Sequence, residues 1–252
     1  MNDEAVERIA ATTSRPPILL SAEHASERLP PGWSWPASDA RLAGTHWAYD
    51  LGIADITRAV AAALGAPAVL SRFSRLLIDP NRPLDSDTLF RREADGLPVG
   101  LNAALTPADR ERRIDTYYRP YHDALAEMVA AHPGVNMLSL HSFTPCYEGQ
   151  RRTVEVGVLF DLHEAWAERW YGALSVHGWV MARNAPWSGR NGLMYAVQHH
   201  AVQHGRQAVE LELRQDLTTD PDARQRLVDG IVAAVRALGE EAPASVAGAR
   251  HA

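Results

Sequence analysis

The chain has little of three things that would place it in other classes of protein: cysteine, excess positive charge and long apolar runs. Its one cysteine, Cys146, excludes an intrachain disulfide and any metal site made of several cysteines, and it fits a reducing compartment. A formal net charge of −6 at pH 7 provides no positive field for nucleic acid. No apolar stretch approaches the roughly 18 residues that span a membrane. The sequence therefore favours a small-molecule partner over nucleic acid or a membrane.

The amino-terminal segment lacks the basic run followed by an apolar run that marks a signal peptide. We expect residues 1–15 to be flexible and the protein to be cytoplasmic. The chain has 252 residues, of which 46% are hydrophobic and 22% charged, enough for one well-buried domain. We place this domain at residues 16–239. Residues 240–252 are rich in alanine and other small residues, so we expect a disordered tail.

Short apolar runs alternate with segments of helical periodicity, which indicates an α/β fold with a sheet flanked by helices. The apolar runs predict strands at residues 17–22, 68–70, 76–78, 135–140, 154–160 and 208–213. The periodic segments predict helices at residues 50–64, 107–131, 164–177, 193–204 and 222–238, the second of them in pieces.

Two histidines follow apolar runs. His24 comes after the first predicted strand, with Glu27 three residues later, and His141 comes after the run that begins at Val135. Open α/β sheets collect their ligands outside the carboxyl ends of strands, so we expect the two imidazoles to meet. Imidazole and carboxylate groups are suitable ligands for zinc. Each histidine taken alone is better explained as a polar residue at the end of a strand.

Arginines and an asparagine surround the apolar run at residues 76–78. Arg75 precedes it, and Asn81 and Arg82 follow it. Guanidinium groups bind carboxylates through charge-assisted hydrogen bonds, and one directed at a developing oxyanion stabilises a tetrahedral intermediate. This pattern predicts an acidic substrate. The alternative is a surface turn at residues 79–81 with solvated arginines.

Glu210, Glu212 and Arg214 alternate with aliphatic residues, which places them on one face of a strand. The ordinary interpretation is a half-exposed strand at the edge of the sheet. The alternative is a buried glutamate beside a metal-bound water, where it would act as the general base of a metal-dependent hydrolase.

Taken in order, these segments resemble the N-formylglutamate amidohydrolase family, which is related to the zinc-dependent aspartoacylase and carboxypeptidase group. The resemblance extends from about Ile18 to Leu217 and is most specific at residues 21–26, 74–82 and 141–145. It implies a three-layer α/β/α fold with a mixed, mainly parallel central sheet. It also implies a zinc enzyme, or one using another divalent metal, that removes a formyl or other acyl group from an N-acylated amino acid such as N-formyl-L-glutamate.

The resemblance implies His24 and His141 as metal ligands and leaves two choices for the carboxylate ligand. Glu27 fits by its spacing from His24, but the prolines and glycine that follow it oppose the growth of a helix there. In this branch of the family asparagine often stands in place of Glu27, whereas the pattern of His46 and Asp50 recurs. Asp50 is therefore our first choice, and its alternative role is as an anion at the start of a helix.

For the reaction, the resemblance implies Glu212 as the general base and Arg75 as the group that stabilises the oxyanion. The substrate's carboxylate would be bound by Asn81 and Arg82, with Arg214 as a further candidate. Two rival functions stay open. One is a carboxypeptidase or another N-acyl amino acid deacylase, and the other is a non-catalytic small-molecule-binding protein on a hydrolase scaffold. The sequence predicts no oligomeric state.

Overall fold

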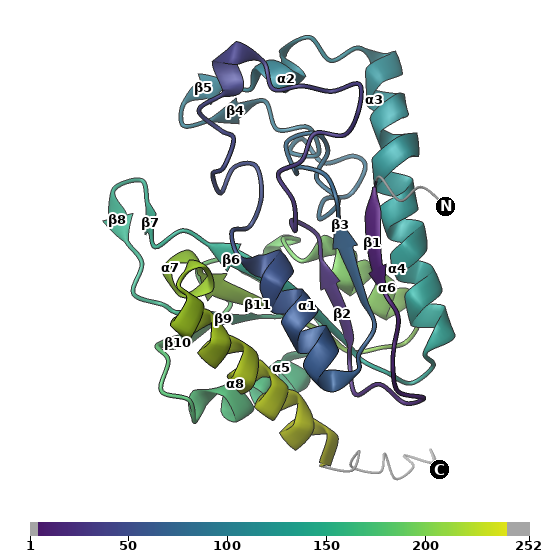
Figure 1. The fold of residues 1–252 in the computed structure, drawn as a ribbon, viewed down its shortest axis with the longest axis vertical. Helices are drawn as coiled ribbons and strands as arrows, with labels where there is room; N and C mark the ends of the chain where they lie inside the picture. The colour runs from purple at the N-terminus through teal and green to yellow at the C-terminus, as the bar shows by residue number, and fades with distance from the viewer. Residues whose placement is uncertain (1–4, 241–252) are drawn as a thin grey trace, which may run out of the picture.

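The structure is a computed structural model that describes residues 5–240 and is built around a seven-stranded sheet (Figure 1). In spatial order the strands are β1 (Val6–Ile9), β3 (Ala68–Ser71), β2 (Leu19–Ala22), β6 (Met137–Phe143), β11 (Ala208–Arg214), β9 (Val156–Leu159) and β10 (Met181–Arg183). The neighbours from β3 to β11 run parallel, as do β9 and β10. Within this sheet, only the β1–β3 and β11–β9 pairs are antiparallel. The expected mixed, mainly parallel sheet is confirmed.

Helices cover both faces of the sheet. In Figure 1, α1 (Ile53–Leu64) and α8 (Pro221–Glu240) lie on one side, and α4 (Arg119–Ala131) and α6 (Tyr195–Gln203) lie on the other. Helix α5 (Glu164–Ser175) joins the first group, whose apolar side chains form one core with one face of the central strands. Helices α4 and α6 form a second core with the opposite face. The three-layer α/β/α architecture is therefore confirmed.

The smaller elements lie in the connections. They are the short helices α2 (Gly100–Ala103), α3 (Pro107–Arg113) and α7 (Gln215–Thr219), the 3-10 turns η1 (Ala37–Asp39) and η3 (Gly189–Asn191), the π-helical turn η2 (Ile114–Tyr118), and the strands β4 (Glu93–Ala94), β5 (Leu97–Pro98), β7 (Cys146–Tyr147) and β8 (Gln150–Arg151). Helix α3, η2 and α4 follow one another directly, so the predicted helix at 107–131 does form in pieces. Thr106 caps it by accepting a hydrogen bond from Asp109 N at 3.1 Å.

Strand β11 is a central strand, so its interpretation as a half-exposed edge was wrong. It lies between β6 and β9, and all seven of its residues are buried. Its aliphatic side chains belong to the core with α1, α5 and α8, which leaves Glu210 and Glu212 on the opposite face. In the register of β11 with β6, Glu212 lies beside His141. The carboxylate and the imidazole are thus brought together by strand pairing alone.

Two other expectations fail. Residues 76–78 form a buried turn, because the Asn102 Nδ2 and Arg113 Nη1 atoms donate to the carbonyl oxygens of Leu76 and Leu77, and no neighbouring strand is needed. Residues 6–9, within the segment expected to be flexible, form β1 by pairing with the free edge of β3. Apart from Glu240, the tail expected at 240–252 lies outside the described residues. Within residues 5–240, no helix has the length and apolar character needed to cross a membrane.

Candidate active site

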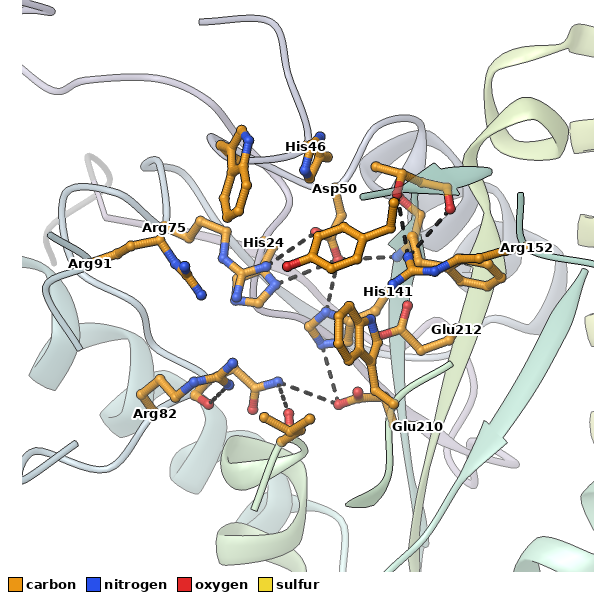
Figure 2. Close-up of a pocket in the computed structure, with 18 residues that line it drawn as sticks. His24, His46, Asp50, Arg75, Arg82, Arg91, His141, Arg152, Glu210 and Glu212 are labelled. Atoms are coloured by element: carbon orange, nitrogen blue, oxygen red, sulfur yellow. Dashed lines mark hydrogen bonds and ion pairs between the residues drawn. The ribbon is translucent and has the colours of Figure 1, made fainter. Parts of the chain in front are cut away.

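A cavity of about 230 Å³ lies at the carboxyl ends of β2 and β6 (Figure 2). Parallel strands collect ligand-binding residues at this end of a sheet. The cavity is lined by most of the residues selected from the sequence: His24, Asp50, Arg75, Asn81, Arg82, His141 and Glu212. Segments far apart in the chain therefore meet in one place.

His24, Asp50 and His141 form a triad, with one ligand atom from each lying within 4.8 Å of the other two. His24 follows β2 closely, Asp50 precedes α1, and His141 lies within β6. The Nδ1 atom of His141 lies 2.9 Å from Asp50 Oδ2, and the Nδ1 atom of His24 lies 3.5 Å from the same oxygen. All three side chains are buried. In the described part of the chain, no other group of histidine, cysteine and carboxylate side chains meets the geometry of a metal site.

The opposite nitrogen of each imidazole is held by a further carboxylate. His24 Nε2 lies 2.7 Å from Asp79 Oδ1, and His141 Nε2 lies 2.9 Å from Glu23 Oε2. The Nδ1 atom of His24 is buried and has no hydrogen-bond partner, which is costly for a polar atom that binds nothing. Two imidazoles and one carboxylate, with each imidazole oriented by another carboxylate, suit a zinc ion. The residues therefore fit a divalent metal.

Gly52 places Asp50 in this cluster. Gly52 is the N-cap residue of α1 and has a φ of 76°, and a Cβ atom there would lie 2.4 Å from the backbone oxygen of Thr218. The Thr218 hydroxyl donates to Leu51 O at 2.7 Å, and Asp50 N donates to His24 O at 2.9 Å. Asp50 thus points to the histidines and does not cap the helix, in contrast to the alternative interpretation of this residue.

Two predicted residues lie outside the cluster. Glu27 Oε2 accepts a hydrogen bond from Gly44 N at 2.5 Å, and this residue does not belong to the triad. Arg214 lies outside the residues that line the cavity, because its guanidinium group pairs with Asp216 at 2.7 Å and with Glu155 at 3.3 Å. Nearby carboxylates of the protein thus pair with the Arg214 guanidinium group, which we expected to bind substrate. The structure places Asp50 in the triad and leaves Glu27 outside it. It places Arg82 in the wall of the cavity and leaves Arg214 outside the cavity.

The two glutamates of β11 differ in their contacts. Glu210 Oε2 lies 3.4 Å from His141 Nε2 and 3.5 Å from Asn81 Nδ2, and burial raises the pKa of Glu210 to about 7. Glu212 Oε2 is buried without a hydrogen-bond partner. Burial raises the pKa of Glu212 well above its ordinary value, and the charges of His141 and Arg75 only partly offset this effect. Glu212 therefore has the carboxylate oxygen that is free to exchange a proton.

Arg75 and Arg82 have different surroundings in the cavity. Arg75 Nη2 donates to Asp79 Oδ2 at 2.7 Å, and its Nη1 lies 3.7 Å from Asp50 Oδ1. Arg82 donates only to neutral oxygens, Thr88 Oγ1 at 3.2 Å and Asn81 O at 2.7 Å. The side-chain amide of Asn81 is held by the backbone, since Nδ2 donates to Leu193 O and Oδ1 accepts from Ala196 N, both at 2.9 Å. Asn81 and Arg82 are the two cavity residues predicted to bind the substrate's carboxylate. Of these, Arg82 is therefore the more available to a substrate.

Sequence reasoning assigned no role to Asp79, Arg91 and Arg152, and it did not predict that Glu23 holds a histidine. Glu23 also accepts hydrogen bonds from the hydroxyls of Ser139 at 2.6 Å and Tyr121 at 2.9 Å. Burial raises the pKa of Glu23, but the hydrogen bonds from His141 and Ser139 outweigh burial and lower this pKa to about 2. The adjacency of Glu23 to His24 was the only sequence signal for it. Asp79 had the pattern of an ordinary turn residue.

Comparison with known proteins extends these findings. Residues 16–219 match the family described as N-formylglutamate amidohydrolase. A solved gene product of Agrobacterium tumefaciens is 28% identical, with a TM-score of 0.85 over 95% of this chain and 96% of that chain. A solved N-formylglutamate amidohydrolase from Ralstonia eutropha is 20% identical, with a TM-score of 0.74 over 94% of this chain and 97% of that chain, and it shows a shared fold. The search of curated proteins found no match.

The family match covers more than half of the chain and includes every residue of the triad. The same stretch contains the glutamates of β11 and the arginines of the cavity. Amide hydrolysis is thus the class of activity that the comparisons support. The chain belongs to the N-formylglutamate amidohydrolase family.

Proposed function

We propose that the protein is a zinc-dependent amidohydrolase that removes a formyl group, or another small acyl group, from an N-acylated amino acid. N-Formyl-L-glutamate is the first substrate to test. The observation that carries the proposal is the unpartnered Nδ1 atom of buried His24 beside Asp50 and His141, with the free carboxylate oxygen of Glu212 in the same cavity. Family membership supports amide hydrolysis, and the Ralstonia eutropha protein bears the name of this reaction.

A divalent ion held by His24, Asp50 and His141 would supply Lewis acidity to the substrate's acyl oxygen and lower the pKa of a bound water. The protein's own groups then have separate tasks. Glu212 Oε2 accepts the proton of the attacking water, and the raised pKa of Glu212 suits a group that later donates this proton to the leaving amine nitrogen. Both transfers need a carboxylate oxygen that no protein donor holds. Glu212 Oε2 has no hydrogen-bond partner, whereas Glu210 Oε2 accepts from Asn81 Nδ2.

The arginines bind the charges of the substrate and of the transition state. Arg75 Nη1, which has no hydrogen-bond acceptor among the described residues, stabilises the developing oxyanion. Arg82 binds the α-carboxylate of the amino acid, and Asn81 fixes the loop that presents Arg82 through its bonds to Leu193 O and Ala196 N. A cavity of about 230 Å³ suits a small substrate. The cytoplasmic location stays a prediction.

Replacement of the general base tests the proposal. We expect Glu212→Gln to lower kcat for formate release from N-formyl-L-glutamate by roughly 10²- to 10⁴-fold, with unchanged metal content, because the amide cannot accept the proton. Elemental analysis and a formate assay measure the two quantities. The control is Glu168→Gln, at an exposed glutamate that pairs with Arg183. Near-normal turnover of Glu212→Gln would contradict the assignment and direct attention to Glu210.

The same measurements separate the rival functions. Stoichiometric metal with turnover only on peptides or on larger N-acyl amino acids would favour a carboxypeptidase or another deacylase. Stoichiometric metal without turnover on any of these substrates would contradict the proposed reaction. A purified protein that neither contains nor binds a divalent metal would favour a small-molecule-binding protein on a hydrolase scaffold.

A further inference from the structure

Residues 79–82 form a turn, which is closed by a hydrogen bond from Arg82 N to Asp79 O at 3.2 Å. Three of its side chains serve the candidate site, since Asp79 orients His24, and Asn81 and Arg82 line the cavity. The carbonyl oxygens of a buried turn need donors from elsewhere in the protein. The position of the three side chains therefore depends on the groups that bind the backbone of this turn.

Two aromatic side chains donate to this backbone from outside the cavity. The Tyr118 hydroxyl donates to Arg82 O at 2.8 Å, and His122 Nε2 lies 3.0 Å from Pro80 O. Tyr118 ends η2 and His122 lies four positions later on α4, and the centroids of their rings are 4.2 Å apart. Neither is among the residues that line the cavity. Both thus hold the turn from behind.

The helix is interrupted just before His122. Pro120 has no N–H group, and its ring opposes the ordinary helical bond to the residue four positions earlier. The backbone widens at this point, and Arg119 N donates to Ile114 O, five positions earlier. An extra residue in one turn rotates the later residues about the helix axis. The local sequence therefore accounts for the π-helical turn that precedes the donor to Pro80 O.

His122 is itself held by His200 of α6, whose Nε2 atom lies 3.0 Å from His122 Nδ1. Pro80 O can only accept a hydrogen bond, so the His122 proton is assigned to Nε2, His122 Nδ1 accepts, and His200 Nε2 donates. His200 Nδ1 is then a bare acceptor, which agrees with its lack of a hydrogen-bond partner within residues 5–240. Burial lowers the pKa of His122 to about 4 and that of His200 to about 3, so both rings are neutral at pH 7.

Helix α6 also binds the turn directly, because Ala196 N donates to Asn81 Oδ1 at 2.9 Å. Helices α4 and α6 therefore clamp the turn between them, and the bond between His122 and His200 joins the two helices. This arrangement fixes the direction of each hydrogen bond from α6 to Pro80 O. Loss of the His122 donor would leave a carbonyl oxygen of the turn without its partner.

We propose that His122 is a positioning residue whose hydrogen bond to Pro80 O, directed by His200, keeps Asp79 behind His24 and Arg82 in the wall of the cavity. The inference rests on the proposed function, because the turn serves the reaction only if its side chains serve a metal and a substrate. The hydrogen bonds themselves need neither metal nor substrate. They can therefore be tested apart from the reaction.

Two substitutions separate the hydrogen bond of His122 from its packing. His122→Phe keeps a ring against Tyr118 and loses the donor, whereas His122→Gln loses the ring and keeps an N–H donor. We expect His122→Phe to raise the dissociation constant for zinc by roughly 3- to 10-fold, because the turn that holds Asp79 must then be ordered as the ion binds. His122→Gln should recover most of this loss. A residue that only fills space would give the opposite order.

Kinetics at saturating zinc give a second measurement. His122→Phe should raise KM for N-formyl-L-glutamate more than it lowers kcat, because the turn carries Arg82, whereas Glu212 lies on β11. The matched control is His199→Phe. His199 also lies on α6, but it stacks on Tyr195 at 5.2 Å and takes no part in the hydrogen bonds that lead to the turn. We expect this variant to keep the zinc affinity and both kinetic constants of the wild-type protein.

Amide hydrogen exchange of the metal-free protein separates this inference from the proposed reaction. Asn81 N donates to Asp79 Oδ1 at 2.9 Å, and Arg82 N donates to Asp79 O. We expect His122→Phe to exchange both amides roughly 3- to 10-fold faster than the wild-type protein, and His122→Gln to exchange them at nearly the wild-type rate.

This exchange pattern in a protein that releases no formate would contradict the proposed reaction and support the positioning role. The inference is overturned if His122→Phe keeps the wild-type zinc affinity or the wild-type exchange rates. It is also overturned if His122→Gln is the more impaired of the two variants, or if His199→Phe causes the same losses.

Discussion

At the scale of single residues, two carboxylates outside the triad hold the imidazoles of His24 and His141. Asp79 and Glu23 each take one imidazole nitrogen, and this leaves both Nδ1 atoms directed toward Asp50. A carboxylate in this position fixes the orientation of the ring and increases its basicity as a ligand. Asp79 also binds Arg75, so it connects the triad to the arginine that we propose as the oxyanion-stabilising group.

We expect Asp79→Asn to weaken zinc binding by roughly 10- to 100-fold, because the amide replaces the anion that holds His24 Nε2. Competition with a chromophoric chelator measures the affinity, and circular dichroism checks the fold. Glu27→Gln is the matched control and should bind zinc almost as tightly as the wild-type protein, since Glu27 contacts Gly44 N. A larger loss of zinc affinity in Glu27→Gln than in Asp79→Asn would restore Glu27 as a ligand.

At the scale of elements, the start of α1 determines where the carboxylate ligand lies. Gly52 has a left-handed conformation and approaches the Thr218 backbone closely, so the connection from His24 to α1 is tied to α7. Asp50 lies in a loop and not in a strand, and this contact holds the loop so that Asp50 faces β6. The position of Asp50 therefore depends on the packing of a turn.

Gly52→Ala should lower the free energy of unfolding by more than about 1 kcal/mol, because a Cβ atom meets Thr218 O and the positive φ is strained for alanine. We expect zinc affinity to fall as well, since Asp50 must shift. Gly172→Ala in α5 is the control: no atom lies within 4 Å of its Cβ position, and alanine there should stabilise the helix by about 0.5–1 kcal/mol. Urea unfolding of both variants measures these effects, and equal stabilities would contradict the role of Gly52.

At the scale of the whole molecule, the triad connects three segments that are far apart in the sequence. The turn after β2, the loop before α1 and β6 each contribute one member of the triad, so a metal bound there would link them in the folded state only. Burial lowers the pKa of His141, but the carboxylates of Glu210, Asp50 and Glu23 outweigh it and hold this pKa well above its ordinary value of 6.5. The carboxylates around His141 thus favour its protonated form in the metal-free protein.

We expect zinc to raise Tm and chelation to lower it, with a stabilisation of about 2.7 kcal/mol at a free metal concentration 100 times Kd. The sign of the pH dependence follows from His141. Because its folded, metal-free pKa is raised, the imidazolium competes with zinc at neutral pH, and the stabilisation by metal should shrink as the pH falls. Thermal melts with zinc and with chelator between pH 6 and pH 8 measure it. His24→Asn should abolish the response, and an equal response in this variant would contradict the triad.

The local features of this protein, and the side chains proposed for its chemistry, follow from the sequence alone. Apolar runs and helical periodicity predicted most strands and helices, because burial imposes these periods on any sequence of this class. His24 and His141 were selected because metal binding needs imidazoles and strand ends bring such residues together, and the family resemblance selected Glu212. The alternation in β11 placed Glu210 and Glu212 on one face, although it did not reveal that the strand is central.

Which charged groups meet depends on how the folded chain packs. The choice of Asp50 over Glu27 depends on the turn at Gly52, and the loss of Arg214 depends on the nearby carboxylates of Asp216 and Glu155. The approach of Arg152 to the cavity depends on rings from three separate segments. Charge pairing acts over a few ångströms in space and has no period along the chain. The sequence therefore specifies the available groups, and only packing of the folded chain selects their partners.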